Sequence, residues 1–539
     1  MSLLVILILL PLVAATVMLL LDAEATPVRA RWSALLATIA TFLVSLVLAS
    51  QYTQLPQIEA AHHASPINPK MELRHEWLTL APSTPGGTPT KFEFYLGVDG
   101  ISVAMILLTT LLCISAVLVS WTAVTERAAE FYAALLILEA GLLGVFCSFD
   151  VLLFYVFFEF TLIPLFFLVG IWGGPLRKYA AGKFFVYTLG GSLITLLGLI
   201  SLVLVVHQQT NLVTPFSIPD LARAVLDHDH RIPIEMQVTL FLMIAAGFMV
   251  KVPLFPFHTW LPLAHVEAPT AGSVLLAGVL LKLGSYGFLR LVLPMLPEAC
   301  ATVGMPLIAT LSVIGIIYGS LCALSQNDIK KLVAYSSVAH LGFCMLGLFA
   351  LNAEGITGGV LQMINHGLST GALFCLVGMF YERYHTRQLS DLGGLATRLP
   401  RLGVMMVFIV FASIGLPGLN GFVGEVLALA GMFKVNMLYA ALGAIGVVLG
   451  AWYLLGVLQK AFFGPVQVPH AHGHHDDDIP DLNAREILTL APLAAMCLYL
   501  GLFPQTLIEL IRPDVEGVTY VYRTTALQTA QVAGSETQP

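Results

Sequence analysis

The sequence predicts an all-α, polytopic membrane protein with about fourteen transmembrane helices. Of its 539 residues, 58% are hydrophobic and only 11% are charged, whereas soluble domains carry roughly 25% charged residues. The apolar residues form separate runs of about 20 residues, the length that crosses about 30 Å of hydrocarbon as a helix. These runs do not alternate in polarity as the strands of a membrane β-barrel do. A helical bundle within the lipid bilayer is therefore expected.

Apolar runs separated by polar breaks define the expected spans. Two long polar connectors, 52–97 and 207–237, are expected to lie outside the membrane. The spans are predicted near 2–21, 32–51, 98–121, 131–148, 150–172, 180–206, 238–263, 270–291, 302–323, 332–351, 357–380, 402–432, 438–461 and 486–510.

The positions of lysine and arginine predict the orientation, because short cytoplasmic connectors are enriched in both. An external N-terminus puts the basic connectors on the cytoplasmic side and leaves the short connectors 292–301 and 352–356 outside. Both termini are then external. The first run has no basic leader and no small-residue cleavage site, so it is interpreted as a retained span and not as a signal peptide.

Two spans contain residues that break helices. Pro253 and Pro256 interrupt one of them, and Pro417, Gly418 and Gly421 interrupt the other. Backbone groups freed within the membrane are tolerated only inside the protein or beside a hydrated cavity. Such paired breaks are typical of secondary transporters with inverted repeats.

We therefore predict two inverted five-helix repeats, each with one broken helix. The expected divisions are 1–130 (N-terminal helices and external loop), 131–263 (first repeat, broken near 251–262), 264–331 (connecting helices), 332–461 (second repeat, broken near 415–421) and 462–539 (cytoplasmic loop, last helix and external tail).

Several ionisable residues lie deep inside the predicted spans. A charged residue at the centre of the bilayer costs about 2.5–3.5 kcal/mol on insertion scales, so an idle charge there is disfavoured. Burial brings the pKa values of carboxyl and amino groups toward neutrality, and imidazole exchanges protons through two nitrogens. The pattern favours a proton relay over a purely structural pairing of Glu159 with Lys251. The relay candidates are Glu159, Lys251, Lys282, His340, His366 and Glu425, with Glu139 and His258 as secondary candidates.

Other functions lack their signatures. The formal net charge of −7 argues against a nucleic-acid partner. The chain has no Walker or dinucleotide glycine motif and no C-x-x-C pair, so no cofactor or metal site is expected in it. The segment from His470 to Asp478 is rich in His and Asp, but such low-complexity stretches are more often solvated linkers than metal sites.

Five motifs carry a resemblance to a known family, which covers nearly the whole chain. They are LGVDGIS (96–102), KVPLFPFHTWLPLAHVEAPTAGS (251–273), KLGSYG (282–287), SQNDIKKLVAYSSVAH (325–340) and GLPGLNGFVGE (415–425). The chain resembles the antiporter-like proton-pumping subunits of respiratory complex I, and within them the M-type (chain 4) members of NADH-quinone oxidoreductase. The acid at Glu425 and the short tail after the last span favour the M-type over the L-type.

The resemblance implies roles for the candidate residues. Glu159 and Lys251 would form a coupling ion pair, and Lys282 would be the central relay. His340 and His366 would connect the two halves, and Glu425 would serve the exit side. It also implies a bacterial inner-membrane location and neighbouring subunits of L and N type. FMN and iron–sulfur clusters would then be carried by partner subunits.

Alternatives remain open from the sequence. A D-type subunit of an Mrp cation/proton antiporter and a membrane-bound hydrogenase subunit share nearly the same motifs. A purely structural membrane scaffold is a third possibility, but it does not explain the buried charges.

Overall fold

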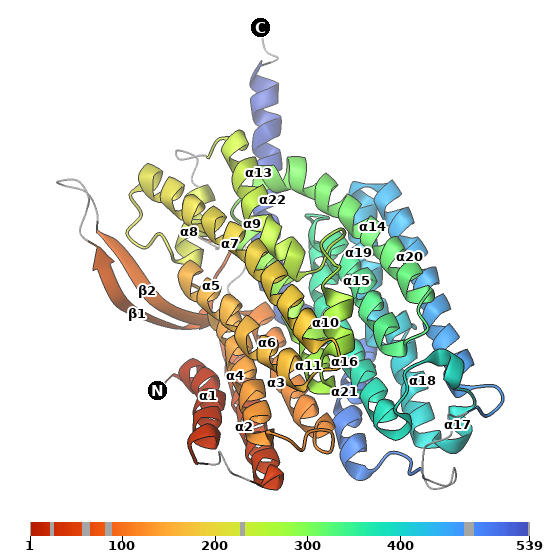
Figure 1. The fold of residues 1–539 in the computed structure, drawn as a ribbon. Coiled ribbons are helices and arrows are strands. Elements are labelled where there is room, and N and C mark those ends of the chain that lie inside the picture. Colours follow the sequence, from red (N-terminus) through yellow and green to blue (C-terminus); the bar gives the residue numbers. More distant parts are fainter. Residues whose placement is uncertain are drawn as a thin grey trace.

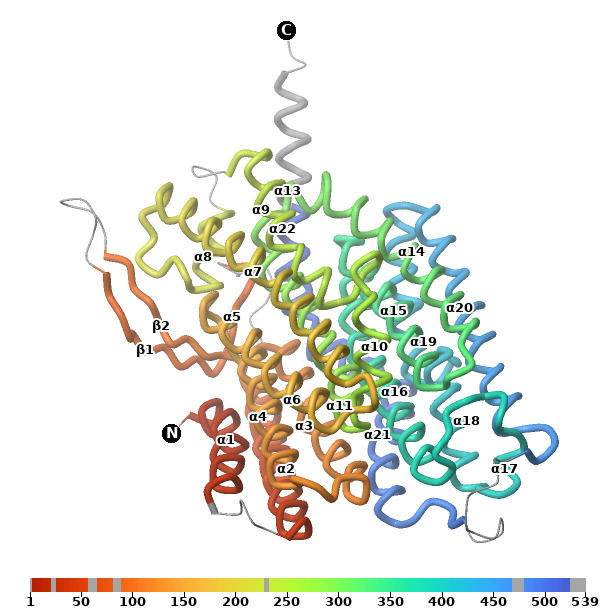
Figure 2. The backbone as a smooth tube through the Cα atoms, viewed as in Figure 1, coloured from red at the N-terminus to blue at the C-terminus, as the bar shows by residue number. Residues whose placement is uncertain are grey.

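The chain forms a bundle of long helices with one β-hairpin projecting from its side (Figures 1 and 2). The computed structural model describes residues 2–21, 26–56, 65–80, 89–226, 232–467 and 479–536, without the side chains of 21 and 524–536. Within these residues, thirteen helices are long and apolar enough to cross a membrane. The predicted polytopic helical fold is confirmed.

The elements follow one another along the chain in the following order. They are α1 (Leu3–Leu21), α2 (Pro27–Gln54), β1 (Lys70–Leu80), β2 (Thr90–Val98), α3 (Gly100–Val119), α4 (Ala128–Cys147), α5 (Val151–Phe160), α6 (Leu162–Trp172), α7 (Arg177–Thr210), α8 (Ile218–Leu226), α9 (Ile234–Lys251), α10 (Leu261–Glu267), α11 (Thr270–Leu275), the π-helix η3 (Leu276–Leu280), α12 (Lys282–Gly287), the π-helix η4 (Phe288–Val292), α13 (Pro297–Ala299), the π-helix η5 (Cys300–Gly304), α14 (Met305–Leu324), α15 (Ile329–Leu348), α16 (Ala353–Tyr384), the 3₁₀-helix η6 (Leu389–Asp391), α17 (Leu395–Arg398), α18 (Pro400–Ile414), α19 (Asn420–Val435), α20 (Met437–Val457), the π-helix η7 (Leu458–Phe462), α21 (Ala484–Leu502) and α22 (Gln505–Glu536).

Each expected span has a counterpart, and both predicted breaks are present. The first separates α9 from α10, and the second separates α18 from α19. The expected last span, 486–510, was wrong as a single helix. It is divided at Phe503-Pro504 into α21 and α22, because a proline lacks the amide that would continue the helix.

The connector 52–97 contains a β-hairpin that the sequence interpretation missed. Strands β1 and β2 pair antiparallel, with Glu76 opposite Glu93. The guanidinium of Arg74 lies 3.9 Å from the centroid of the Tyr95 ring. An isolated bridge joins Leu96 to Ser148 at the end of α4. The hairpin is thus fixed to the bundle at its base.

The region after residue 510 also differs from the expected polar tail. It continues as α22, whose side packed on the bundle includes the buried residues Ile511, Val515 and Val518. Figure 1 shows the end of α22 projecting beyond the bundle. The sequence signal was weak because apolar residues occupy only one face of this helix.

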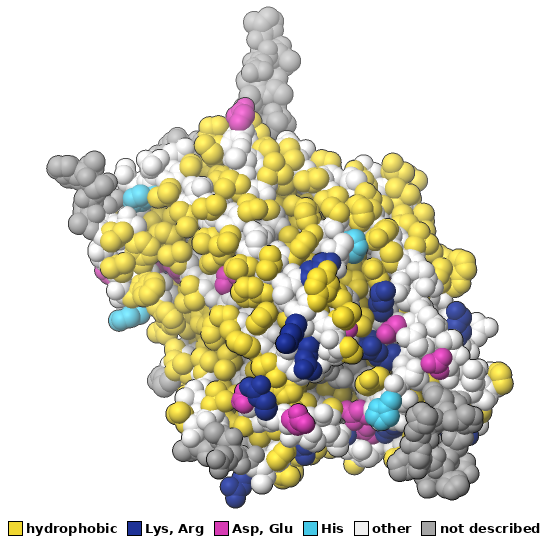
Figure 3. Space-filling model, viewed as in Figure 1, with side chains coloured by type: hydrophobic (Ala, Val, Ile, Leu, Met, Phe, Trp, Pro, Cys, Tyr) yellow, Lys and Arg dark blue, Asp and Glu magenta, His cyan; other side chains and the backbone are white. Residues whose placement is uncertain are grey.

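Two spans form the centre of the bundle. The most apolar 18-residue windows of Thr270–Val292 and Ala353–Tyr384 are completely buried, unlike those of the other spans. The outer helices instead expose large apolar side chains, such as Leu43, Val186 and Val448, and Figure 3 shows an apolar surface over much of the visible face. Apolar exposure of this extent suits a lipid or subunit interface.

Polar connectors meet at one end of the bundle. Arg383 forms an ion pair with Glu486, at 2.7 Å between Nη2 and Oε2. Arg387 donates to the carbonyl oxygen of Val266 at 3.0 Å, and Arg485 donates to Thr122. These contacts join four connectors that the sequence places on the cytoplasmic side. The assignment of this end to the cytoplasm stays a prediction.

The order of the spans bears on the predicted repeats. The first break lies in the fourth span counted from α4, and the second lies in the fourth span counted from Pro297–Leu324. The two groups of five spans are then 128–292 and 297–462. An odd number of spans inverts the second group relative to the first. The repeat stays a prediction, and the matching breaks favour these boundaries over 131–263 and 332–461.

The break between α18 and α19 packs against the end of α21, and this contact is testable at Gly501. A Cβ atom there would lie 2.3 Å from the carbonyl oxygen of Gly418 and 2.4 Å from Cα of Leu419. Because backbone atoms cannot move aside as a side chain can, we expect Gly501→Ala to destabilise the protein by about 1–3 kcal/mol. Membrane abundance and the midpoint of thermal unfolding in detergent should both fall.

The matched control is Gly456→Ala in α20, where nothing lies within 4 Å of the added Cβ. This variant should unfold like the parent protein. Equal stability of the two variants would contradict the close packing of the breaks.

Candidate proton relay

The first broken helix places Lys251 at a helix end inside the bundle. Helix α9 ends at Lys251, and helical structure resumes at Leu261. The indole Nε1 of Trp260 donates a 3.0 Å hydrogen bond to the carbonyl oxygen of Val250. The fully buried indole thus satisfies a carbonyl that the prolines leave without a helical amide.

Lys251 and Glu159 interact electrostatically, but they are not in contact. Within the described chain, no ion pair joins them and Lys251 Nζ has no hydrogen-bond partner. The ammonium instead lies 4.2 Å from the centroid of the Phe158 ring. Glu159 follows Phe158 on α5, is half-buried, and interacts with Lys251 electrostatically. The direct ion pair implied by the resemblance is replaced here by a cation–π contact.

Lys282 lies at the centre of the bundle and is completely buried. Its ammonium donates a hydrogen bond to the carbonyl oxygen of Ala277, in the π-helix η3. A second contact, 2.6 Å long, joins Lys282 Nζ to Nδ1 of His366 on α16. Such π-helical turns are frequent at functional sites. Here the π-helical turn supplies a carbonyl oxygen as a hydrogen-bond partner for the buried Lys282 ammonium.

The contacts that begin at Lys282 continue from His366 to Glu425. The rings of His366 and His340 have centroids 5.7 Å apart. Nδ1 of His340 lies 3.0 Å from Oε1 of Glu425, and the Tyr453 hydroxyl lies 3.4 Å from Nε2 of His340. Four titratable side chains, Lys282, His366, His340 and Glu425, therefore form one buried row across four helical segments.

The second break fixes the position of Glu425. Gly415 adopts φ +82°, a conformation that side chains disfavour, and a Cβ there would lie 3.2 Å from Oε2 of Glu425. Asn365 and Asn420 each donate from their side-chain amide to the other's backbone carbonyl, at 2.7 and 3.2 Å. Gln362 donates to Glu425 Oε1 at 3.1 Å. The break is thereby tied to α16.

The secondary candidates lie apart from this row. Glu139 is completely buried on α4, beside the thiol of Cys113 on α3. His258 is buried in the first break and packs edge-on against Tyr318, with centroids 5.3 Å apart. Within the described residues, no hydrogen bond or ion pair links either side chain to Lys282 or Glu425. The segment His470–Asp478 lies outside the described residues.

Sequence reasoning missed several polar residues around the row. His265 is fully buried and stacks on Phe374 with centroids 4.6 Å apart. Lys330 donates at 2.6 Å to the carbonyl oxygen of Ala268. His265 follows His258 by seven residues in the same broken run, a spacing that could have indicated it. Nothing in the sequence indicated the contacts of Gln362 and Tyr453.

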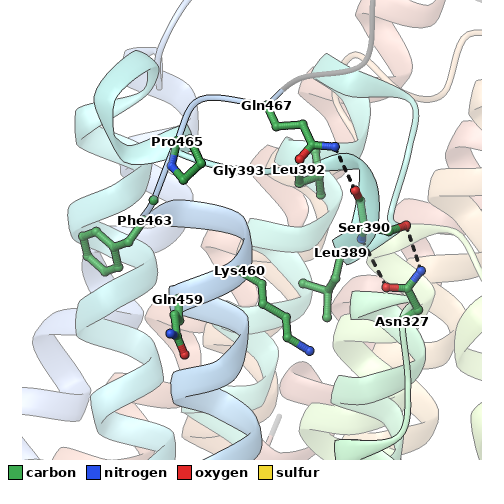
Figure 4. Close-up of a pocket in the computed structure, with 11 residues that line it drawn as sticks. Asn327, Leu389, Ser390, Leu392, Gly393, Gln459, Lys460, Phe463, Pro465 and Gln467 are labelled. Carbon is green, nitrogen blue, oxygen red and sulfur yellow. Dashed lines mark hydrogen bonds between the residues drawn. The ribbon is translucent and has the colours of Figure 1, made fainter.

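A surface hollow of about 830 Å³ lies between the η6 and η7 segments, away from the row (Figure 4). Asn327 Nδ2 donates to Ser390 Oγ at 3.0 Å, and Gln467 Nε2 donates to the Ser390 carbonyl at 3.1 Å. Among the described residues that line it, Lys460 is the single ionisable group and none is a relay candidate. It therefore takes no part in the candidate relay.

Comparisons with known proteins give this geometry a context. The family described as "NADH:quinone oxidoreductase/Mrp antiporter, TM" matches residues 148–450. The chain belongs to this family. It is 42% identical over 520 residues to NADH-quinone oxidoreductase subunit M of Rhodobacter capsulatus, covering 95% of each chain. It is 44% identical over 421 residues to NADH-ubiquinone oxidoreductase chain 4 of Chondrus crispus, covering 78% of this chain and 82% of that one.

Solved structures agree with this family assignment. The fold matches a chain of respiratory complex I from Thermus thermophilus with a TM-score of 0.79 and 30% identity, covering 96% of this chain and 99% of that chain. A chain of the Mrp complex from Dietzia has a TM-score of 0.76 at 20% identity, with 98% and 99% covered, which shows the fold alone. The expected resemblance to antiporter-like complex I subunits is confirmed.

The row predicts how Lys282 responds to substitution. Lys282→Arg keeps a positive charge, but a guanidinium with a pKa above 12 does not readily release its proton. We expect both Lys282→Arg and Lys282→Ala to assemble into their complex at near-normal abundance while losing most proton pumping. The measurements are membrane abundance, electron-transfer rate and vesicle acidification.

Lys434→Ala is the control, since Lys434 is an exposed lysine paired with Glu354. It should leave all three measurements unchanged. Full activity of Lys282→Arg would show that the site needs charge alone and would return Lys282 to a structural role.

Proposed function

We propose that this chain is the M-type subunit of a bacterial NADH-quinone oxidoreductase and that it moves protons along its buried row. The observation that carries the proposal is the contact sequence from Lys282 through His366 and His340 to Glu425. Each of these groups gains and loses a proton without other chemistry. A scaffold would gain nothing from burying four such groups in neighbouring positions.

Proton transfer along the row has a simple order. The Lys282 ammonium faces Nδ1 of His366, so it can donate a proton to a neutral His366 imidazole. His366 passes a proton toward His340, whose Nδ1 faces the Glu425 carboxylate. The hydroxyl of Tyr453 and the amide of Gln362 hold the last two groups in place. Glu425 then stands at the exit of this row, beside the second break.

Glu159 and Lys251 would control the row from the other half. Phe158 and Glu159 are adjacent on α5, so a rotation of about 100°, one residue of helix, would exchange the ring for the carboxylate beside Lys251. At 4 Å a charge pair contributes about 4 kcal/mol for an effective dielectric of 20. The pair thus has two states that differ in how firmly Lys251 holds its proton.

The proposal also specifies the membrane location, the orientation and the neighbouring subunits of the chain. The apolar outer faces suit lipid and neighbouring L- and N-type subunits, and the basic end would face the bacterial cytoplasm with both termini external. Copurification with flavin and iron–sulfur subunits would support this assignment. Copurification with small Mrp chains would instead favour the D-type antiporter subunit.

The role of Glu159 is tested by removing its carboxylate. We expect Glu159→Ala to assemble normally but to lose most proton pumping and coupled quinone reduction, because Lys251 would lack its charge partner. Glu159→Asp should retain part of the activity, since the charge survives with a shorter reach. Pumping would be measured in reconstituted vesicles.

The control is Glu130→Gln, which removes an exposed carboxylate paired with Arg127. It should pump like the parent complex. Normal pumping by Glu159→Ala would exclude the proposed control role.

The chain is proposed to hold no redox centre, with FMN and iron–sulfur clusters confined to partner subunits. We expect the isolated chain to retain neither flavin, haem nor iron after detergent exchange. Absorption spectra and metal analysis of the purified chain would measure this. A stoichiometric cofactor would refute it.

A further inference from the structure

A second buried ionic cluster lies between α3, η4 and α22, apart from the proposed relay. Arg290 forms an ion pair with Asp99, and both are almost completely buried, with exposed fractions of 2% and 0%. Asp514, only 9% exposed, accepts a 3.2 Å hydrogen bond from the backbone amide of Ile101. Asp514 also interacts electrostatically with Arg290 and Asp99. Asp99 therefore pairs directly with the guanidinium, and Asp514 adds a second carboxyl group to its surroundings.

The chain is shaped to bring these acids together. Asp99 caps α3 by accepting from the amide of Ser102 at 2.9 Å. A Cβ atom on Gly100 would lie 1.9 Å from the Leu510 carbonyl oxygen and 2.9 Å from Oδ2 of Asp514. Only glycine permits this approach of α22 to the start of α3. The hydrogen bond between Ile101 and Asp514 joins residues 413 positions apart, so the contact is a specific feature of the fold.

The charges of the cluster do not balance. If both acids were ionised, they would leave one negative charge buried beside a single Arg290, a costly arrangement without solvent. One proton held by the two acids leaves them with a single negative charge, which Arg290 balances. Carboxyl groups that share a site commonly hold one proton between them. In the part of the chain that the structure describes, the other titratable side chains that interact with the cluster are Tyr52 of α2 and Tyr286 of α12, and neither supplies a positive charge.

One member of the cluster, Arg290, lies on the same span as Lys282 of the proposed relay. Lys282, Tyr286 and Arg290 follow at intervals of four residues, so the line runs about 12 Å from the centre of the bundle toward the predicted external end. The Tyr286 hydroxyl lies 2.9 Å from Ser102 Oγ. Arg290 Nη2 donates to the same oxygen at 3.5 Å. Hydroxyl groups thus connect the line to the acids.

We infer that Asp99 and Asp514 share one exchangeable proton beside Arg290 and form a proton-holding site on the external side of Lys282. The site accepts a proton from the Tyr286–Ser102 side as a carboxylate becomes a carboxylic acid. It releases the proton to external water as the carboxylate re-forms. This inference rests on the proposed proton relay and adds a second position for protons outside it.

Infrared spectroscopy of the assembled complex tests the shared proton. The parent complex should show a carboxylic acid band that shifts on exchange into D₂O, and Asp514→Asn should lose it. Asp514→Glu should move the band without deleting it. Glu509→Gln, an exposed acid on the same helix, should keep it. An unchanged band in both Asp514→Asn and Asp99→Asn would overturn the inference.

Vesicle acidification per electron pair then separates a proton site from a structural clamp. Asp514→Asn should lower this ratio, whereas Asp514→Glu should preserve it. Tyr286→Phe removes only a hydroxyl and should also lower the ratio, which keeps the test open if Asp514→Asn does not assemble. A normal ratio in Tyr286→Phe and Asp514→Asn, with a lowered one in Lys282→Ala, would overturn this inference alone. A normal ratio in Lys282→Ala would instead overturn the relay.

Discussion

The structure depends on the cost of placing charged groups where neither water nor lipid headgroups reach them. Lys282 and His366 lie on the two spans that other helices surround completely. Both side chains are buried, and burying a polar group is costly unless it is hydrogen-bonded. Lys282 obtains one partner from a backbone carbonyl of a π-turn and another from His366. Glu425 obtains His340 and Gln362. The helices around them are therefore arranged by polar contacts as much as by apolar packing.

Irregular backbone provides many of these partners. The break after Lys251 ends a helix inside the bundle, and Trp260 satisfies a carbonyl there. The break before Asn420 lets Asn365 and Asn420 exchange hydrogen bonds. In a regular helix the backbone amides and carbonyls pair with one another, so only side chains could bond to other segments. The same irregularity weakens the helix locally, so it is stable only because neighbouring helices surround it.

Much of this architecture could be predicted from the sequence. The spans follow from apolar length, and the two breaks follow from proline and glycine, because both signals are local. The depth of each ionisable residue follows from its position within a span. What the sequence did not show depends on contacts between distant segments. These include the position of Lys251 over Phe158 and the approach of Asp514 to Gly100. The hairpin and the division at Phe503-Pro504 are local features that the interpretation from apolar runs missed. The order of the row also needed the fold, since His340 and His366 meet only through packing of α15 on α16.

The proposed relay has an apolar interruption, and this interruption has a physical consequence. Between Lys251 and Lys282 the chain packs Gly284 against Val252 and Gly287 against Phe248, with added Cβ atoms at 2.6 and 2.5 Å from those side chains. A proton cannot cross such a layer without a polar carrier. An unbroken path across the membrane would let protons flow back down their gradient. A relay that stores energy therefore needs a layer that protons cannot cross at rest, and the packed glycines provide such a layer between the two lysines.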